Sequence, residues 1–426
     1  METLLTTSPK PIAPAPGENS FLETAADIGR LICRDAIWHR SRCNFLTSIN
    51  DPAYDYPRPY FKALEADFYS GSAGVAFFLA ALYRAAPDRQ LRKTALGILQ
   101  TTLDNARRIA PPSVLGFFTG WTGIAWVAIQ AGRWLGEEEP IVRGLQLLHS
   151  VATLDLEQTG MDVVDGAAGV IPVLRQVEAG YPEQNRRDFV IRLADHLLST
   201  AERSPAGWSW KTVTGGNHRN LTGFAHGVAG IVNALLEAAD LTGSAVYREA
   251  AFEGLRYENT WFLPAEQNWP DFRMGTQAPS NPMAVEAPAC SCAWCHGAPG
   301  IALSRLRGFE LTGDKTLLTE AETAVRTTAR QLTWEQQMNF SQCHGLAGNA
   351  DVLLEASAIL QEPAWREKAE ATGRMGQERF ARTGLWANGL YNDFQIPDFM
   401  LGLSGTGYFY LRLFRPESFR SVLLLR

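Results

Sequence analysis

The sequence is short of positive charge and has no long apolar run. Its 426 residues carry 39 Lys and Arg against 45 Asp and Glu, which gives a net charge of -6. This balance argues against a nucleic-acid partner, because a nucleic-acid surface needs clustered basic side chains. The best apolar stretch, residues 74–86, is interrupted by Arg84, whereas a membrane-spanning helix needs about 18 or more uninterrupted apolar residues. We therefore expect no nucleic-acid partner and no stable membrane insertion.

A secretory signal is also missing from the sequence. Residues 1–17 contain one Lys and several prolines, but not the apolar core of a signal peptide. We therefore expect a cytoplasmic protein with a flexible Pro-rich tail over residues 1–18 and one domain over residues 19–426. Apolar residues at helical spacing predict a first helix over residues 21–37.

Cysteine is scarce and unevenly placed. Of the six cysteines, Cys290, Cys292, Cys295 and Cys343 fall in one short part of the chain. In a reducing compartment, such clustering indicates metal or thiol chemistry more than disulfides. Hydrophobic residues make up 46% of the chain and charged residues 20%, which excludes a disordered protein and predicts a large core.

Glycine is abundant, and many of the 37 glycines belong to a repeated motif. The pattern Gly-x-x-Gly, followed by an apolar run, occurs seven times. Its first glycines are Gly71, Gly120, Gly166, Gly227, Gly297, Gly345 and Gly402. They are 46 to 70 residues apart, which leaves room for two helices and their loops in each repeat. One such motif means little, but seven of them form a period.

The segments within each repeat differ in their hydrophobic pattern. Those that follow the glycines, such as residues 75–83 and 231–239, are apolar on most faces, so the predicted helices are buried all round. Segments between them, such as residues 186–202 and 314–331, carry one apolar stripe and indicate half-exposed outer helices. The pattern predicts an all-α fold, an α/α toroid (double α-barrel) of seven helix pairs. The alternative is an open helical solenoid, which rarely makes one helix of every pair so uniformly apolar.

The glycine motifs also predict where a site lies. If every inner helix begins in the same way, seven helix N-termini face one end of the barrel. Their aligned dipoles give that end a positive potential suited to thiolates and other anions.

The residues directly before the glycine motifs include three of the seven histidines. In chain order they are Ser70, Thr119, Asp165, His226, His296, His344 and Leu401. One position earlier stand Cys295 and Cys343, which are one repeat apart and so belong to neighbouring helix starts on a toroid. Two thiolates and an imidazole form a Zn²⁺ site with one open position, which is the catalytic type. The alternative is a structural zinc site made of Cys290, Cys292 and Cys343.

Other polar residues near the motifs are candidates for acid–base chemistry. His226 shares the repeat position of the other two histidines but follows Ala225 in place of a cysteine, so we expect an acid–base role for it. The alternative for His226 is a hydrogen-bonded core histidine. Asp162 and Asp165 beside the third motif either cap a helix or take part in the chemistry, and His218 is equally consistent with a loop.

Several segments together point to a known family. They are Asp162-Val-Val-Asp-Gly166, Gly223-Phe-Ala-His-Gly227, Trp294-Cys-His-Gly297, Cys343-His-Gly345 and Leu401-Gly-Leu-Ser-Gly-Thr-Gly-Tyr408. This constellation resembles the lanthionine synthetase C-like cyclases over about residues 20–426. Residues 68–71 and 421–425 are most similar to the C-terminal cyclase domain of bifunctional class II lanthipeptide synthetases.

The resemblance implies a zinc-dependent enzyme acting on a dehydrated precursor peptide. The reaction adds cysteine thiols to dehydroalanine or dehydrobutyrine and closes (methyl)lanthionine thioether rings. Zn²⁺ would be held by Cys295, Cys343 and His344. His226 would donate the proton, and Asp162 would orient a catalytic histidine or help to deprotonate the thiol.

The chain departs from the family in two respects. The large dehydratase domain of the bifunctional enzymes has no counterpart within the 426 residues, so we expect a separate dehydratase as partner. The family often has an Arg four residues before its first cysteine ligand, and here that position is Ser291. Any role of that Arg in handling the enolate is therefore absent or taken over by another residue.

Two other functions are consistent with the fold. A glycoside hydrolase would need two carboxylates beside a cleft, for which Asp393 and Asp398 are candidates, but it leaves the Cys-His pairs unexplained. A non-catalytic protein of the same scaffold would bind glutathione or a peptide at the zinc.

Overall fold

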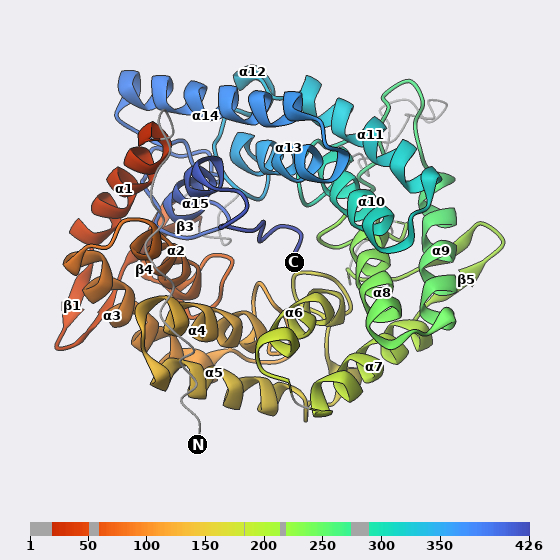
Figure 1. Ribbon diagram of the computed structural model, residues 1–426, viewed down its shortest axis with the longest axis horizontal. Coiled ribbons are helices and arrows are strands. Elements are labelled where there is room, and N and C mark those ends of the chain that lie inside the picture. Colours follow the sequence, from red (N-terminus) through yellow and green to blue (C-terminus); the bar gives the residue numbers. More distant parts are fainter. Residues whose placement is uncertain (1–18, 51–58, 183, 214–218, 274–288) are drawn as a thin grey trace.

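The computed structural model describes residues 19–50, 59–182, 184–213, 219–273 and 289–426, which form a closed ring of helices (Figure 1). Within these ranges there are seven inner and seven outer helices. The inner helices are α2 (Ser72–Ala85), α4 (Trp121–Leu135), α6 (Ala167–Gly180), α8 (Val228–Thr242), α10 (Ala298–Thr312), α13 (Leu346–Leu360) and α15 (Leu403–Phe414). The outer helices are α1 (Asn19–Arg34), α3 (Arg89–Asn105), α5 (Glu138–Val151), α7 (Gln184–Ser199), α9 (Ala245–Asn259), α11 (Lys315–Arg330) and α14 (Pro363–Thr383). The predicted tail over residues 1–18 and His218 lie outside the described residues.

Helix α1 closes the ring. It precedes the first glycine motif, yet it packs against α15, the inner helix of the last repeat (Figure 1). Phe21 of α1 is buried with its ring centroid 6.1 Å from that of Tyr410 in α15. The prediction of a closed α/α toroid of seven helix pairs is confirmed, and the open solenoid is excluded. The first helix ends at Arg34, shorter than predicted, because a strand begins at Ile37.

The two kinds of helix follow from their sequences. In α2 the side chains from Val75 to Leu82 are at most 1% exposed, so the helix has no face toward water. The outer helices α3 and α11 bury one stripe and begin at aspartates. Asp88 accepts hydrogen bonds from the backbone N–H groups of Gln90 and Leu91, and Asp314 caps α11 in the same way. These side chains satisfy N–H groups that a helix start leaves without partners.

The glycine motifs let each inner helix begin against its own loop. A Cβ atom at Gly300 would lie 2.2 Å from the carbonyl oxygen of Trp294 and 2.5 Å from the Cβ of Phe224 in the neighbouring repeat. Any larger residue would push α10 away from both. Gly297 adds a backbone requirement, because its φ of +89° is a conformation that residues with a side chain rarely adopt.

Backbone hydrogen bonds join the loops around this rim. Their donors and acceptors stand two or three positions before the first glycine of each motif. The N–H to carbonyl pairs are Tyr69 to Phe118, Phe118 to Val164, Val163 to Ala225, Ala225 to Cys295, Cys343 to Met400 and Met400 to Tyr69, at 2.8–3.2 Å. Within the described chain, the loops of Cys295 and Cys343 share no such backbone bond, and side chains link them instead: Gln337 and Asn349 donate hydrogen bonds to the carbonyl oxygen of Cys292.

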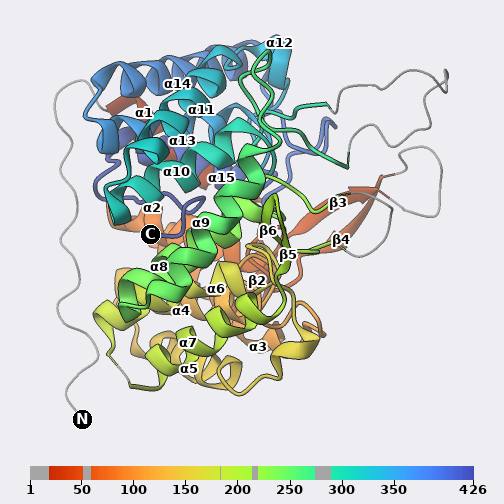
Figure 2. The ribbon, with the colours of Figure 1, turned by 90° about the vertical axis from the view of Figure 1, so that its right-hand side faces the viewer.

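Short additional elements lie outside the helical repeat. Within the described residues, three antiparallel strand pairs join β1 with β2, β3 with β4 and β5 with β6. The strands are β1 (Ile37–His39), β2 (Arg42–Asn44), β3 (Leu46–Asn50), β4 (Pro59–Ala63), β5 (Glu202–Ser204) and β6 (Gly207–Ser209), and a short helix α12 spans Trp334–Gln337. Figure 2 shows β3 and β4 extending away from the ring. No helix in the described part of the chain combines the length and apolar character needed to cross a membrane.

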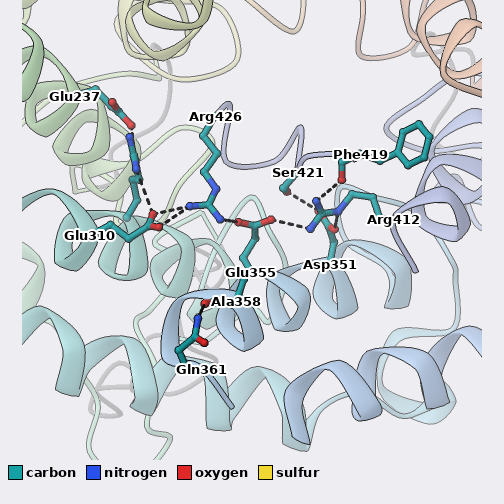
Figure 3. Close-up of polar contacts among 11 residues, drawn as sticks. Glu237, Glu310, Asp351, Glu355, Ala358, Gln361, Arg412, Phe419, Ser421 and Arg426 are labelled. Atoms are coloured by element: carbon teal, nitrogen blue, oxygen red, sulfur yellow. Dashed lines mark hydrogen bonds and ion pairs between the residues drawn. The ribbon is translucent and has the colours of Figure 1, made fainter. Parts of the chain in front are cut away.

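A buried charge network lies near the C-terminal ends of the inner helices (Figure 3). Arg412 of α15 donates hydrogen bonds to Asp351 and, at 2.7 Å, to Glu355, both on α13. It also donates to the carbonyl oxygen of Phe419 at 2.7 Å. Because all three charged side chains are buried, each depends on the others for compensation.

The C-terminal segment is attached to the same network (Figure 3). Arg426 forms ion pairs with Glu310 at 2.6 Å and with Glu355 at 2.5 Å. Further back, the carbonyl oxygen of Leu423 accepts a hydrogen bond from the indole N–H of Trp294 at 3.0 Å. Trp294 directly precedes Cys295, so the C-terminal segment supports the loop that carries a predicted zinc ligand.

Candidate functional site

The thiols of Cys295 and Cys343 meet at the rim between the starts of α10 and α13. The interaction between the two thiols lowers the pKa of Cys295 and raises the pKa of Cys343. Burial acts to raise the pKa of both thiols, and for Cys295 the positive charges of Arg273 and His226 oppose this effect. Cys343 is thus the more firmly protonated of the two thiols. The structure thus brings together the two cysteines that the repeat spacing had placed at neighbouring helix starts.

The third predicted ligand, His344, has its ring held by the adjacent loop. Its Nε2 lies 2.9 Å from the carbonyl oxygen of Gly389, and its ring stacks on that of Tyr391 with centroids 5.8 Å apart. An N–H donated to a backbone carbonyl fixes the tautomer and leaves the lone pair on Nδ1, as is usual for a histidine that binds a metal. Among the described residues, however, no three His, Cys, Asp or Glu side chains are grouped closely enough to hold a metal ion. Two neighbouring thiols and one such imidazole nevertheless match the donor types that zinc takes.

Cys290 and Cys292 lie in a different environment from this pair. Burial raises the pKa of Cys290 to about 11 and that of Cys292 to about 12, as is typical of unreactive thiols. The carbonyl oxygen of Cys292 accepts hydrogen bonds from the side chains of Gln337 and Asn349. These contacts give Cys292 a role in holding its loop, and they favour Cys295 over Cys292 as the partner of Cys343.

His226 and Asp162 form a hydrogen-bonded pair beside the thiols. Asp162 uses its two carboxylate oxygens differently: Oδ1 accepts hydrogen bonds from the N–H groups of Val164 and Asp165, and Oδ2 lies 2.6 Å from Nδ1 of His226. Burial acts to lower the pKa of His226, but the hydrogen bond and charge of Asp162 outweigh it, so the pKa is raised above its ordinary value. Asp162 therefore both shapes a turn and orients a histidine. Asp165 is engaged elsewhere, with the hydroxyl of Thr119 at 2.6 Å.

His296 packs against the ring of His226. The two rings stack with centroids 6.0 Å apart, and His296 is only 1% exposed. Burial lowers the pKa of His296 to about 3, even though Nδ1 lies 3.9 Å from Oδ1 of Asp271. A neutral His296 adds no positive charge beneath His226. His296 stands at the same repeat position as His226 and His344, but its side chain is buried.

Tyr69 also lies at the site, although no role was predicted for it. Burial raises the pKa of its hydroxyl, and the nearby Cys343 thiol adds to this effect. A signal was present, because Tyr69 stands two residues before Gly71, the same repeat position as Cys295 and Cys343.

Arg273 and Asp271 were also missed. They precede the long insertion between the fourth and fifth motifs, where no repeat marks them. Arg273 pairs with Asp271 through Nε at 3.0 Å and Nη2 at 2.9 Å. Burial opposes the ionisation of Asp271, but these hydrogen bonds and the nearby positive charge outweigh it and lower its pKa to about 2.

The carboxylates considered for glycoside hydrolysis do not flank a common cleft. Asp398 is 2% exposed and accepts a hydrogen bond from the N–H of Leu401 at 2.9 Å, whereas Asp393 lies on an exposed loop. Burial, with the nearby charge of Asp67, raises the pKa of Asp398 to about 7. Asp398 thus holds a turn of the kind that Asp162 forms.

Comparisons with known proteins identify the family and the fold. The sequence profile of the family described as Lanthionine synthetase C-like protein matches residues 62–424. Lacticin 481/lactococcin biosynthesis protein LcnDR2 of Lactococcus lactis subsp. lactis is 22% identical over 376 residues, which cover 85% of this chain and 37% of that protein. The chain thus spans less than half the length of this relative. The solved structure of nisin cyclase matches with a TM-score of 0.67 and 15% identity over 96% of this chain and 98% of that chain. At this identity the likeness shows a shared fold.

Proposed function

The chain belongs to the lanthionine synthetase C-like family, and from this membership we propose that it is a zinc-dependent lanthipeptide cyclase. The observation that carries the proposal is the meeting of two thiols, Cys295 and Cys343, beside a histidine–aspartate pair at one rim of the toroid. The substrate is a peptide that contains cysteine together with dehydroalanine or dehydrobutyrine. The product is a (methyl)lanthionine thioether ring.

Cys295, Cys343 and His344 would hold the zinc ion. A free thiol with a pKa of about 8.5 is mostly protonated at neutral pH, and bound zinc supplies the charge that deprotonates a coordinated thiol. The carbonyl oxygen of Gly389 keeps the proton of His344 on Nε2. This contact orients one side chain of the ligand set.

His226 is the proposed proton donor. Addition of the cysteine sulfur to Cβ of the dehydrated residue forms the C–S bond and moves the alkene electrons into an enolate. A proton must then reach Cα to complete the ring. The raised pKa of His226 keeps a larger share of this residue protonated near neutral pH, which is the form that a general acid needs. Asp162 orients the ring through Nδ1 and leaves Nε2 to deliver the proton.

The experiment supplies a peptide that is already dehydrated. Because the proposed reaction is an addition, it leaves mass unchanged, so loss of free thiol is followed by alkylation and mass spectrometry. The zinc-loaded protein, without ATP or a dehydratase, is expected to remove thiols faster than the uncatalysed background. The Cys343→Ala variant is the matched control and should give the background rate. If the zinc-loaded protein also gives the background rate with several cysteine-containing dehydrated peptides, a non-catalytic protein that binds glutathione or a peptide becomes the better proposal.

A further inference from the structure

A hydrogen-bonded chain of three residues holds a positive charge at the rim. Asp271 is 1% exposed and binds the Arg273 guanidinium through both of its carboxylate oxygens. Ser291 donates a hydrogen bond to Oδ2 of the same carboxylate at 3.1 Å. The side chain of Arg273 remains 41% exposed. The guanidinium is therefore fixed at one edge while part of it stays open to a ligand.

The hydrogen-bonded group of Arg273, Asp271 and Ser291 contacts the candidate site. Oδ1 of Asp271 lies 3.9 Å from Nδ1 of His296, whose ring stacks on His226. The hydroxyl of Thr222, in the loop that carries His226, donates to the carbonyl oxygen of Pro270 at 2.6 Å. The segment that ends at Arg273 is thus attached to the His226 loop by a side-chain contact and by a hydrogen bond.

We propose that Arg273 is a further catalytic residue, whose guanidinium binds the carbonyl oxygen of the dehydrated residue and stabilises the enolate formed there. The inference rests on the cyclase function proposed above. In the reaction the substrate S–H and C=C bonds are consumed and the new C–S and Cα–H bonds are formed. The negative charge appears on the carbonyl oxygen between these events, and Arg273 remains unchanged.

The electrostatics of the rim agree with this role. Asp271, which holds the guanidinium, lies 3.9 Å from His296, and the ring of His296 stacks on that of His226. The cation is therefore fixed beside the predicted proton donor. A fixed cation at the place where negative charge develops lowers the barrier, because it needs no reorganisation during the reaction. Its planar set of donors suits an oxygen anion better than a lysine ammonium does.

Ser291 gives the proposal a specific test. It stands four residues before Cys295, and its hydroxyl reaches the carboxylate that holds Arg273. We expect an arginine introduced at position 291 to reach the same carboxylate of Asp271. The positive charge could thus be restored through the same carboxylate when Arg273 is removed.

The experiment compares the zinc-loaded wild type with Arg273→Gln, Arg273→Lys and the double variant Arg273→Gln/Ser291→Arg. Arg326→Gln is the control, because Arg326 forms an exposed ion pair with Glu322 on the outer helix α11. Thiol loss from a dehydrated peptide gives kcat and KM, while zinc content and thermal unfolding report on the intact site. We expect Arg273→Gln to lower kcat about 100-fold, with zinc content kept and KM changed little. The kcat of Arg273→Lys should lie between those of the wild type and Arg273→Gln. The double variant should recover at least a tenth of the wild-type kcat.

The outcomes separate this inference from the function on which it rests. An active wild type with an equally active Arg273→Gln variant would overturn the role of Arg273 alone. The same conclusion would follow if the double variant, with normal zinc content and unfolding temperature, were no faster than Arg273→Gln. A wild type that holds zinc but does not accelerate thiol loss would overturn the cyclase proposal, and the role of Arg273 with it.

Discussion

Nδ1 of His226 lies 2.6 Å from Oδ2 of Asp162, although the two residues are 64 positions apart in the chain. They come from neighbouring repeats, in which the aspartate stands four residues before its glycine and the histidine one residue before the next. Asp67 and Asp398 occupy the aspartate position in other repeats, but the repeats that follow them present Thr119 and Ser70 in place of a histidine. The proposed catalytic pair thus uses an aspartate position that recurs in other repeats, and here the next repeat supplies a histidine beside it.

Asp162→Asn is expected to move the pH dependence of cyclisation. Asp162 raises the pKa of His226, so without its charge the pKa falls. A general acid works in its protonated form, so the rate declines as pH rises through this pKa, and the decline should begin at lower pH in the variant. A pH profile of kcat checks this. Asp165→Asn is the matched control, because Asp165 is hydrogen-bonded to Thr119, and it should leave the decline close to the wild-type pH.

His226→Asn should separate the proton donor from the zinc ligands. The variant is expected to keep its zinc and its fold while losing about 10²- to 10⁴-fold in kcat, the usual contribution of a general acid. His149→Asn, on the exposed face of α5, is the control and should retain full activity. Unchanged cyclisation by the His226 variant would remove this residue from the mechanism.

Metal analysis should find about one zinc ion per chain, because the predicted ligands form one site. Cys343→Ala is expected to lose most of this zinc, since it removes one of two sulfur ligands. Cys292→Ala changes another cysteine of the same region and should keep the zinc. Equal loss of zinc in the two variants would show that the ligand set has been assigned wrongly.

Arg412→Met is expected to destabilise the ring without touching the rim. The variant leaves Asp351 and Glu355 buried without their main cation, a change that typically lowers the free energy of unfolding by about 3–5 kcal/mol. Denaturant unfolding measures the effect. Arg326→Gln on the surface of α11 should change the free energy of unfolding by no more than about 0.5 kcal/mol. A similar small change for Arg412→Met would mean that the network contributes little.

Much of the fold and part of the site could be predicted because the repeat carries spatial information. Equivalent positions in successive repeats lie side by side on a ring, so spacing alone brought Cys295 next to Cys343. The same rule could have identified Tyr69, but a tyrosine at a position shared with Phe118 and Met400 resembles a core residue. The rule fails outside the repeat, as it did for Arg273.

Some features have no periodic signal at all. The three hairpins are made of strands of three to five residues, too short for an alternating pattern to stand out. One carboxylate oxygen of Asp162 binds backbone N–H groups and the other binds His226. These individual hydrogen bonds depend on side-chain placement and not on sequence spacing. Sequence alone therefore left capping and chemistry as alternatives for Asp162, whereas the structure shows one oxygen in each kind of contact.

The missing backbone link between the loops of Cys295 and Cys343 has a mechanical consequence. In the described ranges, a backbone hydrogen bond joins neighbouring loops at the other six junctions of the ring, whereas this junction has only side-chain links, from Gln337 and Asn349 to the carbonyl oxygen of Cys292. A zinc ion held by both Cys295 and Cys343 would connect the two loops directly and reduce how often they separate. Zinc loading should then slow amide hydrogen exchange at residues 293–296 and 342–345 much more than at residues 163–166, across the ring. Equal exchange at residues 293–296 and 342–345 with and without zinc would show that the metal does not stabilise this junction.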